Sequence, residues 1–137
     1  TLPVYYAPET GPDLVELARS KDLAIDQLIE LHAGTHYYAY ANGFAPGFCY
    51  LGEIPARLAV PRLDTPRRQV AAGSVGIADR QTAIYPMASP GGWRLLGRCP
   101  LPLFCPESTP PTTICIGDTV KFHAIDRQTF LALGGVL

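Results

Sequence analysis

Three short segments combine arginine, proline, glycine and aromatic residues in a pattern that suits binding of a small anion. They are residues 43–52, 61–68 and 85–93. Guanidinium groups bind carboxylates and phosphates through paired hydrogen bonds, and proline-rich loops lose little entropy in holding them. Aromatic walls beside an arginine would complete a pocket for a small planar anion. The alternative is that these segments are only turns at the end of a β-barrel.

Positive charge is concentrated in the middle of the chain. Residues 42–104 hold seven arginines and three acidic residues, whereas the rest holds four basic and nine acidic residues. This asymmetry favours an anionic small molecule or an acidic partner surface, unless the arginines merely solvate loops. The net charge is −1, and no aromatic–basic string of the RNA-binding type occurs, so we expect no nucleic-acid partner. The apolar runs fall far short of the roughly 20 residues of a membrane span, so we expect no membrane association.

The sequence lacks the motifs of several common catalytic and metal-binding sites. The cysteines at 49, 99, 105 and 115 form no CxxC pair and have no histidine near them in sequence, so we predict no metal site and reduced thiols. Cys49 could act as a nucleophile, but a small buried thiol is the favoured interpretation. No phosphate-binding P-loop, no Gly-x-Ser-x-Gly elbow and no HExxH pair occurs. A self-contained serine hydrolase or metallohydrolase is therefore poorly supported.

The elements that must position these segments are short. The chain has 137 residues, which suits one domain, and its 13 glycines and 14 prolines favour many tight turns. Capping and apolar periodicity predict helices at about 12–20 and 24–33, and a last helix from Asp126 to Leu131. Strands are predicted at 36–41, 74–78, 81–85, 93–98 and 119–123, with Asp79 and Arg80 forming a hairpin turn. This pattern predicts a barrel or a sandwich with the helices packed on one side.

Six segments together carry a family resemblance. They are GFAPGFCYLG at 43–52, PRLDTPR at 61–67, AGSVGIA at 72–78, QTAIYP at 81–86, SPGGW at 89–93 and GR at 97–98. In this order and spacing they closely resemble the allophanate hydrolase subunit 1 family, which includes the B subunit of 5-oxoprolinase and the sporulation-kinase inhibitor KipI. The resemblance extends from about residue 11 to residue 122. One departure is Cys49, which stands where the family has a small residue or proline and argues against a thiol mechanism.

The resemblance implies a fold that is mainly β with flanking short helices, a cyclophilin-like closed β-barrel. It implies one domain over residues 1–137, with barrel strands from about residue 36 onward. Family members usually carry an N-terminal α/β domain before the point where this chain starts. Because the chain opens at Thr1 without that domain, we expect a fragment or a processed product. Prolyl isomerase activity is not implied.

The resemblance also implies a function that this chain does not perform alone. We expect a cytoplasmic subunit of a hydrolase that uses ATP to open the lactam of 5-oxoproline to glutamate, or of a related allophanate hydrolase or urea carboxylase complex. ATP would act at the level of the complex. The expected partners are a third subunit and a homologous cyclophilin-like subunit, of the type found as allophanate hydrolase subunit 2 or as the C subunit of 5-oxoprolinase. The alternative is a protein-binding module that inhibits a sensor histidine kinase, with Phe44, Phe48 and Tyr50 as anchors.

Twelve residues are assigned to the lactam-opening reaction on this basis. Charge clamps and hydrogen-bonding orienters are needed because the reaction activates an amide oxygen and develops negative charge. The predicted catalytic residues are Arg62, Arg67, Arg94, Gln81, Thr82 and Tyr85, with Arg68 a weaker candidate. The predicted substrate-binding residues are Phe44, Pro46, Phe48, Tyr50, Ser89 and Trp93.

Overall fold

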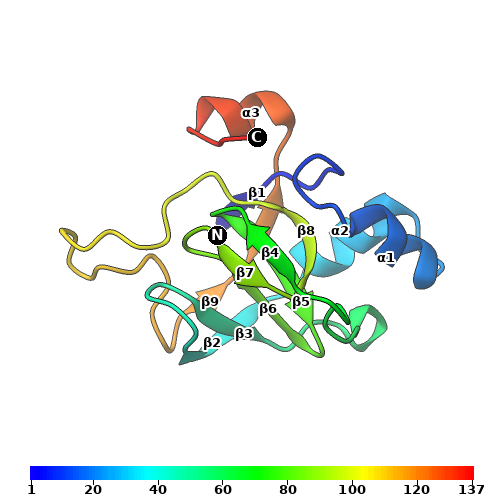
Figure 1. Ribbon diagram of the computed structural model, residues 1–137, viewed down its shortest axis with the longest axis horizontal. Coiled ribbons are helices and arrows are strands. Elements are labelled where there is room, and N and C mark those ends of the chain that lie inside the picture. Colours follow the sequence, from blue (N-terminus) through cyan, green and yellow to red (C-terminus); the bar gives the residue numbers. More distant parts are fainter.

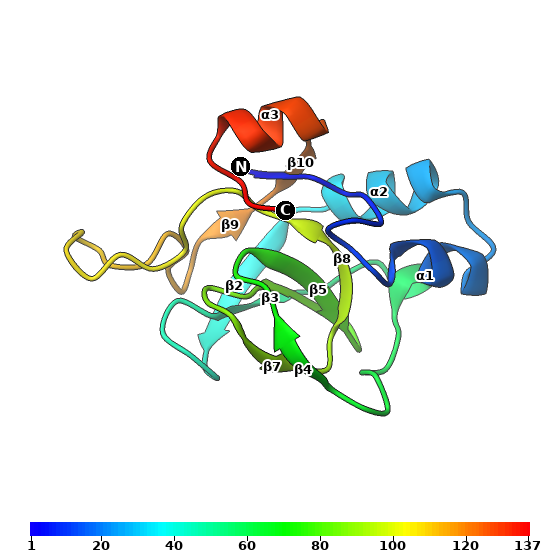
Figure 2. The same cartoon turned by 45° about the horizontal axis from the view of Figure 1, so that its top comes forward.

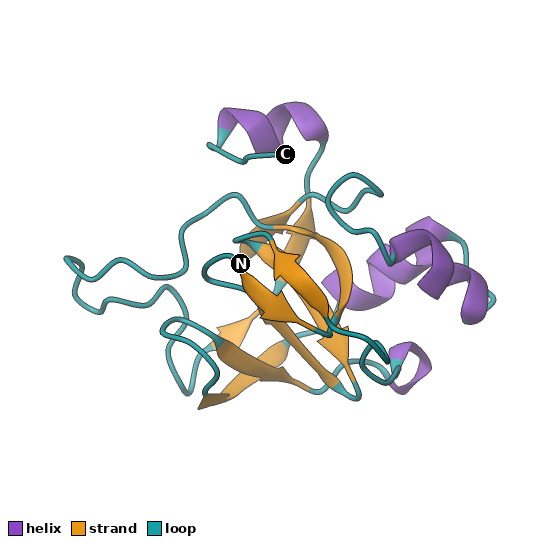
Figure 3. Ribbon diagram, in the orientation of Figure 1, coloured by secondary structure: helices purple, strands orange, loops and turns teal.

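The structure is a computed structural model that describes residues 1–137, and it is mainly β with a few short helices (Figure 3). The helices are α1 Leu14–Ser20, α2 Ile25–Ala33 and α3 Arg127–Ala132, with a short 3₁₀ turn η1 at Ala56–Leu58. The strands are β1 Leu2–Val4, β2 Tyr37–Asn42, β3 Cys49–Gly52, β4 Arg67–Val70, β5 Ser74–Ala78, β6 Gln81–Ile84, β7 Ser89–Gly91, β8 Arg94–Arg98, β9 Thr119–Val120 and β10 Phe122–Ala124.

Six strands form the central antiparallel sheet, in the order β8-β5-β6-β3-β2-β9 (Figure 1). Strands β4 and β7 form a separate antiparallel ribbon, and β1 pairs in parallel with β10. A single bridge between Tyr5 and Arg98 connects the segment after β1 to the outer strand β8. The strand pairings themselves do not join β8 to β9, so closure into a barrel stays a prediction.

The first two helices lie side by side at one side of the sheet, and α3 lies apart from them near the chain ends (Figure 2). The predictions at 12–20 and 24–33 are confirmed as α1 and α2, which begin one or two residues later. The last helix is also confirmed: the Asp126 carboxylate accepts a hydrogen bond from the Thr129 N–H at 2.8 Å and caps α3. No helix of this structure has the length and apolarity that crossing a lipid bilayer requires.

The predicted hairpin is confirmed, whereas the segment predicted as a single strand near the C-terminal end forms two strands. Strands β5 and β6 pair around Asp79 and Arg80, and Asp79 takes the left-handed conformation with φ 53°. The segment predicted as one strand at 119–123 divides at Lys121. It divides because β9 pairs with β2 while β10 turns to pair with β1. The sequence patterns predict none of the strands β1, β3, β4 and β7.

Two apolar clusters make up the core. The larger one fills the space between the helices and the central sheet. The smaller one is aromatic and contains Phe48, Tyr85 and Trp93 from the regions around β3, β6 and β8. The smaller cluster forms the floor of the cavity described next.

Candidate functional site

A cavity of about 310 Å³ opens beside the aromatic cluster, and we call it the aromatic cavity. Its walls come from the loop before β3, the loop between η1 and β4, and the segment from β6 to β8. The lining residues are Phe44, Phe48, Tyr50, Arg62, Leu63, Pro66, Tyr85, Pro90, Gly91, Gly92 and Trp93. Six of the twelve residues predicted for the site therefore meet in one cavity.

Phe48 is the centre of the aromatic wall. Its ring lies 5.1 Å from Phe44, 5.1 Å from Tyr50, 5.6 Å from Tyr85 and 5.6 Å from Trp93, in edge-on geometries. Edge-to-face contacts at these separations stabilise the cluster beyond simple burial. Phe48 is buried, whereas Phe44 is 61% exposed and takes a positive φ of 69° in the loop. The wall is therefore rigid at its base and open at its rim.

Arg62 supplies the only charge that lines this cavity. Its guanidinium carbon lies 6.0 Å from the centre of the Trp93 ring, within the range of a cation–π contact. Its loop is fixed by two hydrogen bonds: Leu63 N–H donates to the Gly92 carbonyl at 2.7 Å, and Arg94 Nε–H donates to the Pro61 carbonyl at 3.0 Å. Arg62 makes no ion pair, so its charge is available to an anion.

Tyr85 is buried beneath the same cavity. Burial raises the pKa of its hydroxyl, although the nearby guanidinium groups of Arg62 and Arg67 oppose the shift. The phenol therefore stays protonated near neutral pH. A Cβ at Gly91 would lie 2.3 Å from the Tyr85 oxygen, so the close approach of β7 to this ring requires glycine.

Arg67, one of the three predicted charge clamps, is paired with Asp13 and does not line the aromatic cavity. Its two terminal nitrogens donate to the Asp13 carboxylate at 2.8 and 2.9 Å. The same carboxylate accepts a hydrogen bond from Leu95 N–H at 2.8 Å. The pair joins the start of α1 to β4 and β8, so Arg67 connects elements rather than facing the cavity.

Three other predicted residues lie next to the aromatic cavity without lining it. Arg94 lines a separate cavity of about 260 Å³ together with Asp13 and Glu16, and it holds the Pro61 carbonyl as described. Ser89 lies in β7, and its hydroxyl oxygen is buried without a hydrogen-bond partner. Pro46 belongs to the loop that carries Phe44 but is not among the lining residues.

Gln81 and Thr82 lie away from the aromatic cavity. Gln81 donates to the Tyr40 hydroxyl at a different cavity, over β2 and β3. Thr82 is completely buried, and its hydroxyl donates to the Gly76 carbonyl at 2.8 Å and contacts His32 Nε2 at 2.9 Å. The alternation of side chains along β6 places these neighbours on opposite faces of the sheet. In this structure Thr82 is therefore part of the core and lies away from the aromatic cavity.

Five lining residues were not predicted as site residues: Leu63, Pro66, Pro90, Gly91 and Gly92. All of them lie inside the segments 61–68 and 85–93 singled out in the sequence. Their contribution depends on backbone shape, which residue types did not reveal. The partner of Arg67, Asp13, was missed because it lies 54 residues away in sequence.

The thiols and possible metal ligands do not add to this site. All four cysteines are free, and Cys49 is buried, as its favoured interpretation predicted. Burial raises the pKa of the Cys49 thiol, which disfavours the reactive thiolate. No group of three or more histidine, cysteine, aspartate or glutamate side chains is placed to hold a metal ion.

The fold and this site define a β-rich domain with short helices and an aromatic cavity carrying one arginine at its rim. The chain belongs to the carboxyltransferase domain family, subdomains C and D, which it matches over residues 1–114. The family resemblance inferred from the motifs is thereby confirmed.

The chain is similar to curated proteins named as the B subunit of 5-oxoprolinase. It is 47% identical over 131 residues to that of Bacillus subtilis (strain 168), covering 96% of this chain and 55% of the relative. It is 46% identical over 121 residues to that of Escherichia coli O157:H7, covering 88% of this chain and 56% of the relative. The chain thus spans about half the length of these curated relatives.

Solved structures agree with the fold. A conserved uncharacterized protein, PH0987, from Pyrococcus horikoshii superimposes with a TM-score of 0.90 at 49% identity, over 94% of this chain and 60% of that one. The Kluyveromyces lactis urea carboxylase superimposes with a TM-score of 0.72 at 16% identity, over 96% of this chain and 14% of that one. At that identity the second likeness concerns the fold alone.

Proposed function

We propose that this chain is part of the B subunit of a 5-oxoprolinase, acting in a complex that uses ATP to open the lactam of 5-oxoproline to glutamate. The observation that carries the proposal is an aromatic cavity with one unpaired arginine, in a chain 46–47% identical to proteins named as that subunit. The segments that build this cavity are those on which the family resemblance rests.

The chemistry of 5-oxoproline suits the aromatic cavity. The molecule is a small five-membered lactam that carries one carboxylate at neutral pH. The Arg62 guanidinium would bind that carboxylate, and the rings of Phe48 and Trp93 would pack against the lactam. Arg62 would then orient the ring, while the groups that activate the lactam carbonyl come from the rest of the complex.

The finer features of the assembly belong to the same proposal. Tyr5, just after β1, pairs with Arg98 in the edge strand β8, and β1 pairs with β10, which follows the other edge strand β9. These contacts link the two edges of the central sheet and support a cyclophilin-like closed barrel. The proposed partners are a homologous cyclophilin-like subunit and a third subunit. ATP would be used by the complex, and the complex would be cytoplasmic.

The test is ATP hydrolysis that depends on 5-oxoproline, measured with the full-length protein and its partner subunits, and again with each subunit omitted. We expect turnover only when this protein is present. Arg62→Gln should raise the KM for 5-oxoproline about tenfold, the cost of losing one charged hydrogen bond. Arg57→Gln is the matched control, because Arg57 is exposed in η1 and makes no ion pair. An assembled complex whose turnover does not need this protein would refute the proposal.

Carboxyl transfer is a second candidate, favoured by the description of the family that matches residues 1–114. An assembled complex without 5-oxoproline-dependent turnover, but with carboxyl transfer from a biotin carrier to an amide, would support it. No observation of the site or the relatives reported above favours the kinase-inhibitor alternative.

A further inference from the structure

A second cavity, of about 510 Å³, lies beside the C-terminal tail, and we call it the tail cavity. It shares no lining residue with the aromatic cavity. Its walls come from the turn between β4 and β5, the segment after β8, and the tail at 134–137. The lining residues are Gln69, Ala71, Ala72, Gly73, Pro86, Ala88, Arg98, Cys99, Pro100, Leu101, Pro102, Leu103, Gly134, Gly135, Val136 and Leu137.

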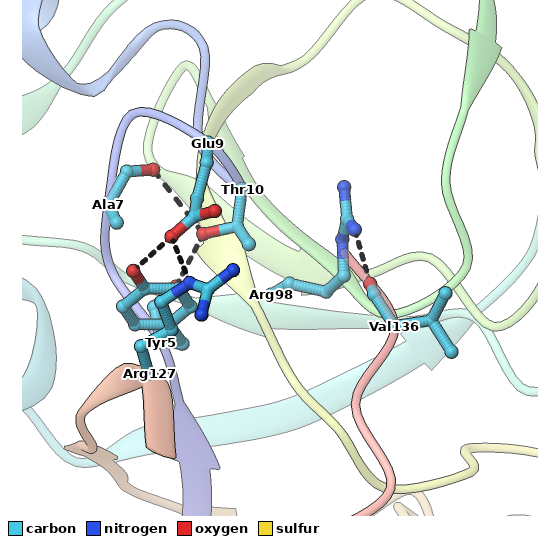
Figure 4. A network of polar contacts seen from close by, with 7 residues as sticks. All are labelled: Tyr5, Ala7, Glu9, Thr10, Arg98, Arg127 and Val136. Carbon is cyan, nitrogen blue, oxygen red and sulfur yellow. Dashed lines mark hydrogen bonds and ion pairs between the residues drawn. The ribbon is translucent and has the colours of Figure 1, made fainter. Parts of the chain in front are cut away.

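Arg98 is the one charged side chain that lines this cavity, and no acidic side chain lines it. No carboxylate lies within 4.0 Å of its guanidinium nitrogens. Arg98 Nη1 donates to the carbonyl of Val136 at 2.6 Å, whereas Nε is buried without a hydrogen-bond partner (Figure 4). The protein itself therefore leaves this guanidinium incompletely paired.

The nearest acidic side chain in that view is committed to other groups. The Glu9 carboxylate accepts hydrogen bonds from the Tyr5 hydroxyl and from Arg127 Nε, the latter at 3.1 Å, and it makes no ion pair with Arg98 (Figure 4). Burial also lowers the pKa of Arg98, which reflects a charge removed from water without a counter-charge. Only Nε is fully buried, and the rest of the guanidinium is partly exposed, so an anion could reach it and accept hydrogen bonds from it.

The backbone fixes the position of Arg98. Its N–H donates to the Tyr5 carbonyl at 3.0 Å, and its carbonyl accepts from Tyr5 N–H at 2.9 Å. Arg98 pairs with Ser74 in the neighbouring strand β5. Its side chain packs closely over Gly73, because a Cβ added to Gly73 would lie only 3.2 Å from Arg98 Cγ. The guanidinium is thus presented by a rigid strand, as preorganised binding of an anion requires.

We propose that the tail cavity binds a small monocarboxylate with an uncharged, mostly apolar body, whose carboxylate accepts hydrogen bonds from the Arg98 guanidinium. The aliphatic side chains of Leu101 and Leu103, with three prolines, would surround that body. Inorganic phosphate fits poorly, because a dianion needs more donors than one guanidinium offers.

Butyrate and butyramide test this proposal, because they have the same shape and differ in charge. Each is titrated into the full-length protein while the methyl NMR signals of Leu101, Leu103 and Val136 are followed. We expect butyrate to shift these signals and to bind about tenfold or more tightly than butyramide. Equal affinities, or shifts confined to Leu63 in the aromatic cavity, would overturn the proposal. This outcome does not depend on turnover, so it is separate from the test of the proposed function.

Two variants locate the charge. Arg98→Gln should remove the preference for butyrate, whereas Arg57→Gln should retain it. If Arg98→Gln bound butyrate as tightly as the wild type does, the assignment to Arg98 would be wrong. Should Arg98→Gln fail to fold, the comparison of butyrate with butyramide on the wild type still decides the matter.

Discussion

At the scale of single residues, the ion pair between Asp13 and Arg67 determines which arginines can meet a ligand. Asp13 is buried and accepts three hydrogen bonds, two from Arg67 and one from the backbone of Leu95. A bidentate pair of this kind is stronger than an exposed ion pair, since both partners are partly removed from water. The pair holds Arg67 away from the aromatic cavity and leaves Arg62 as its charged residue.

Asp13→Asn should therefore destabilise the protein. Asparagine is nearly isosteric but loses the charge and one of the two oxygen acceptors. We expect the free energy of unfolding to fall by about 2–3 kcal/mol, the range for breaking a partly buried charged network. Urea unfolding measures this loss. The control is Asp64→Asn, because Asp64 is exposed in the loop between η1 and β4. If Asp13→Asn loses no more stability than this control, the role of Asp13 is contradicted.

Residue types in the sequence revealed where the cations are but not which of them are paired. Arg62, Arg67 and Arg94 are the same residue type beside proline- and glycine-rich segments, yet one lines the aromatic cavity, one pairs with Asp13 and one donates to a carbonyl. Those differences depend on contacts between residues 33 to 54 positions apart in sequence. Local sequence patterns do not predict such long-range pairings.

At the scale of elements, His32 joins helix α2 to the central sheet. Thr82 donates its hydroxyl proton to the Gly76 carbonyl, so it accepts from His32 Nε2–H at 2.9 Å. The other ring nitrogen, Nδ1, then accepts from the Tyr6 hydroxyl at 2.7 Å. The ring also stacks on Phe122, with 5.0 Å between centroids. Both ring nitrogens are satisfied only while His32 is neutral.

This arrangement predicts a dependence of stability on pH. Burial lowers the pKa of His32 to about 3, so in the pH range between about 3 and 6.5 the unfolded chain binds a proton that the folded chain does not. Stability therefore rises with pH in that window and is lost as the pH falls. We expect this histidine to contribute a loss of about 2 kcal/mol between pH 7 and pH 5.

Urea unfolding at several pH values checks this prediction. His32→Gln should flatten the dependence between pH 5 and pH 7, whatever its effect on stability at pH 7. His36→Gln is the control, because His36 is exposed before β2 and should leave the wild-type dependence unchanged. An unchanged slope in His32→Gln would show that other groups cause the effect.

The helices were predictable because their signals are local, whereas the shortest strands were not. Apolar periodicity was sufficient to predict α1 and α2, and the cap at Asp126 was sufficient to predict α3. Strands β1 and β7 have three residues each, too few for an alternating pattern to stand out. They exist because β1 pairs with β10 near the other end of the chain, and β7 pairs with β4 across the intervening hairpin of β5 and β6.

At the scale of the whole molecule, the aromatic cavity joins segments that are far apart in the sequence. Its lining residues come from three segments separated by more than ten residues in sequence, brought together by β3, the β4–β7 ribbon and the start of β8. The family motifs in the sequence predicted that these segments act together. They could not predict that the tail would form a second cavity around Arg98, because Val136 contacts Arg98 from 38 positions away.

Under the proposed function, we expect the aromatic cavity to bind 5-oxoproline before partner subunits join. Trp93 is the single tryptophan of the sequence and forms part of the wall, so its fluorescence should report occupancy. We expect 5-oxoproline to change the emission of the full-length protein without partners, and Trp93→Phe to remove that change. Arg62→Gln should weaken the response about tenfold in ligand concentration, whereas Arg57→Gln should not. A response that arises only after partner subunits are added would mean that the partners complete the site. In that case Arg62 would act at an interface rather than in a cavity of its own chain.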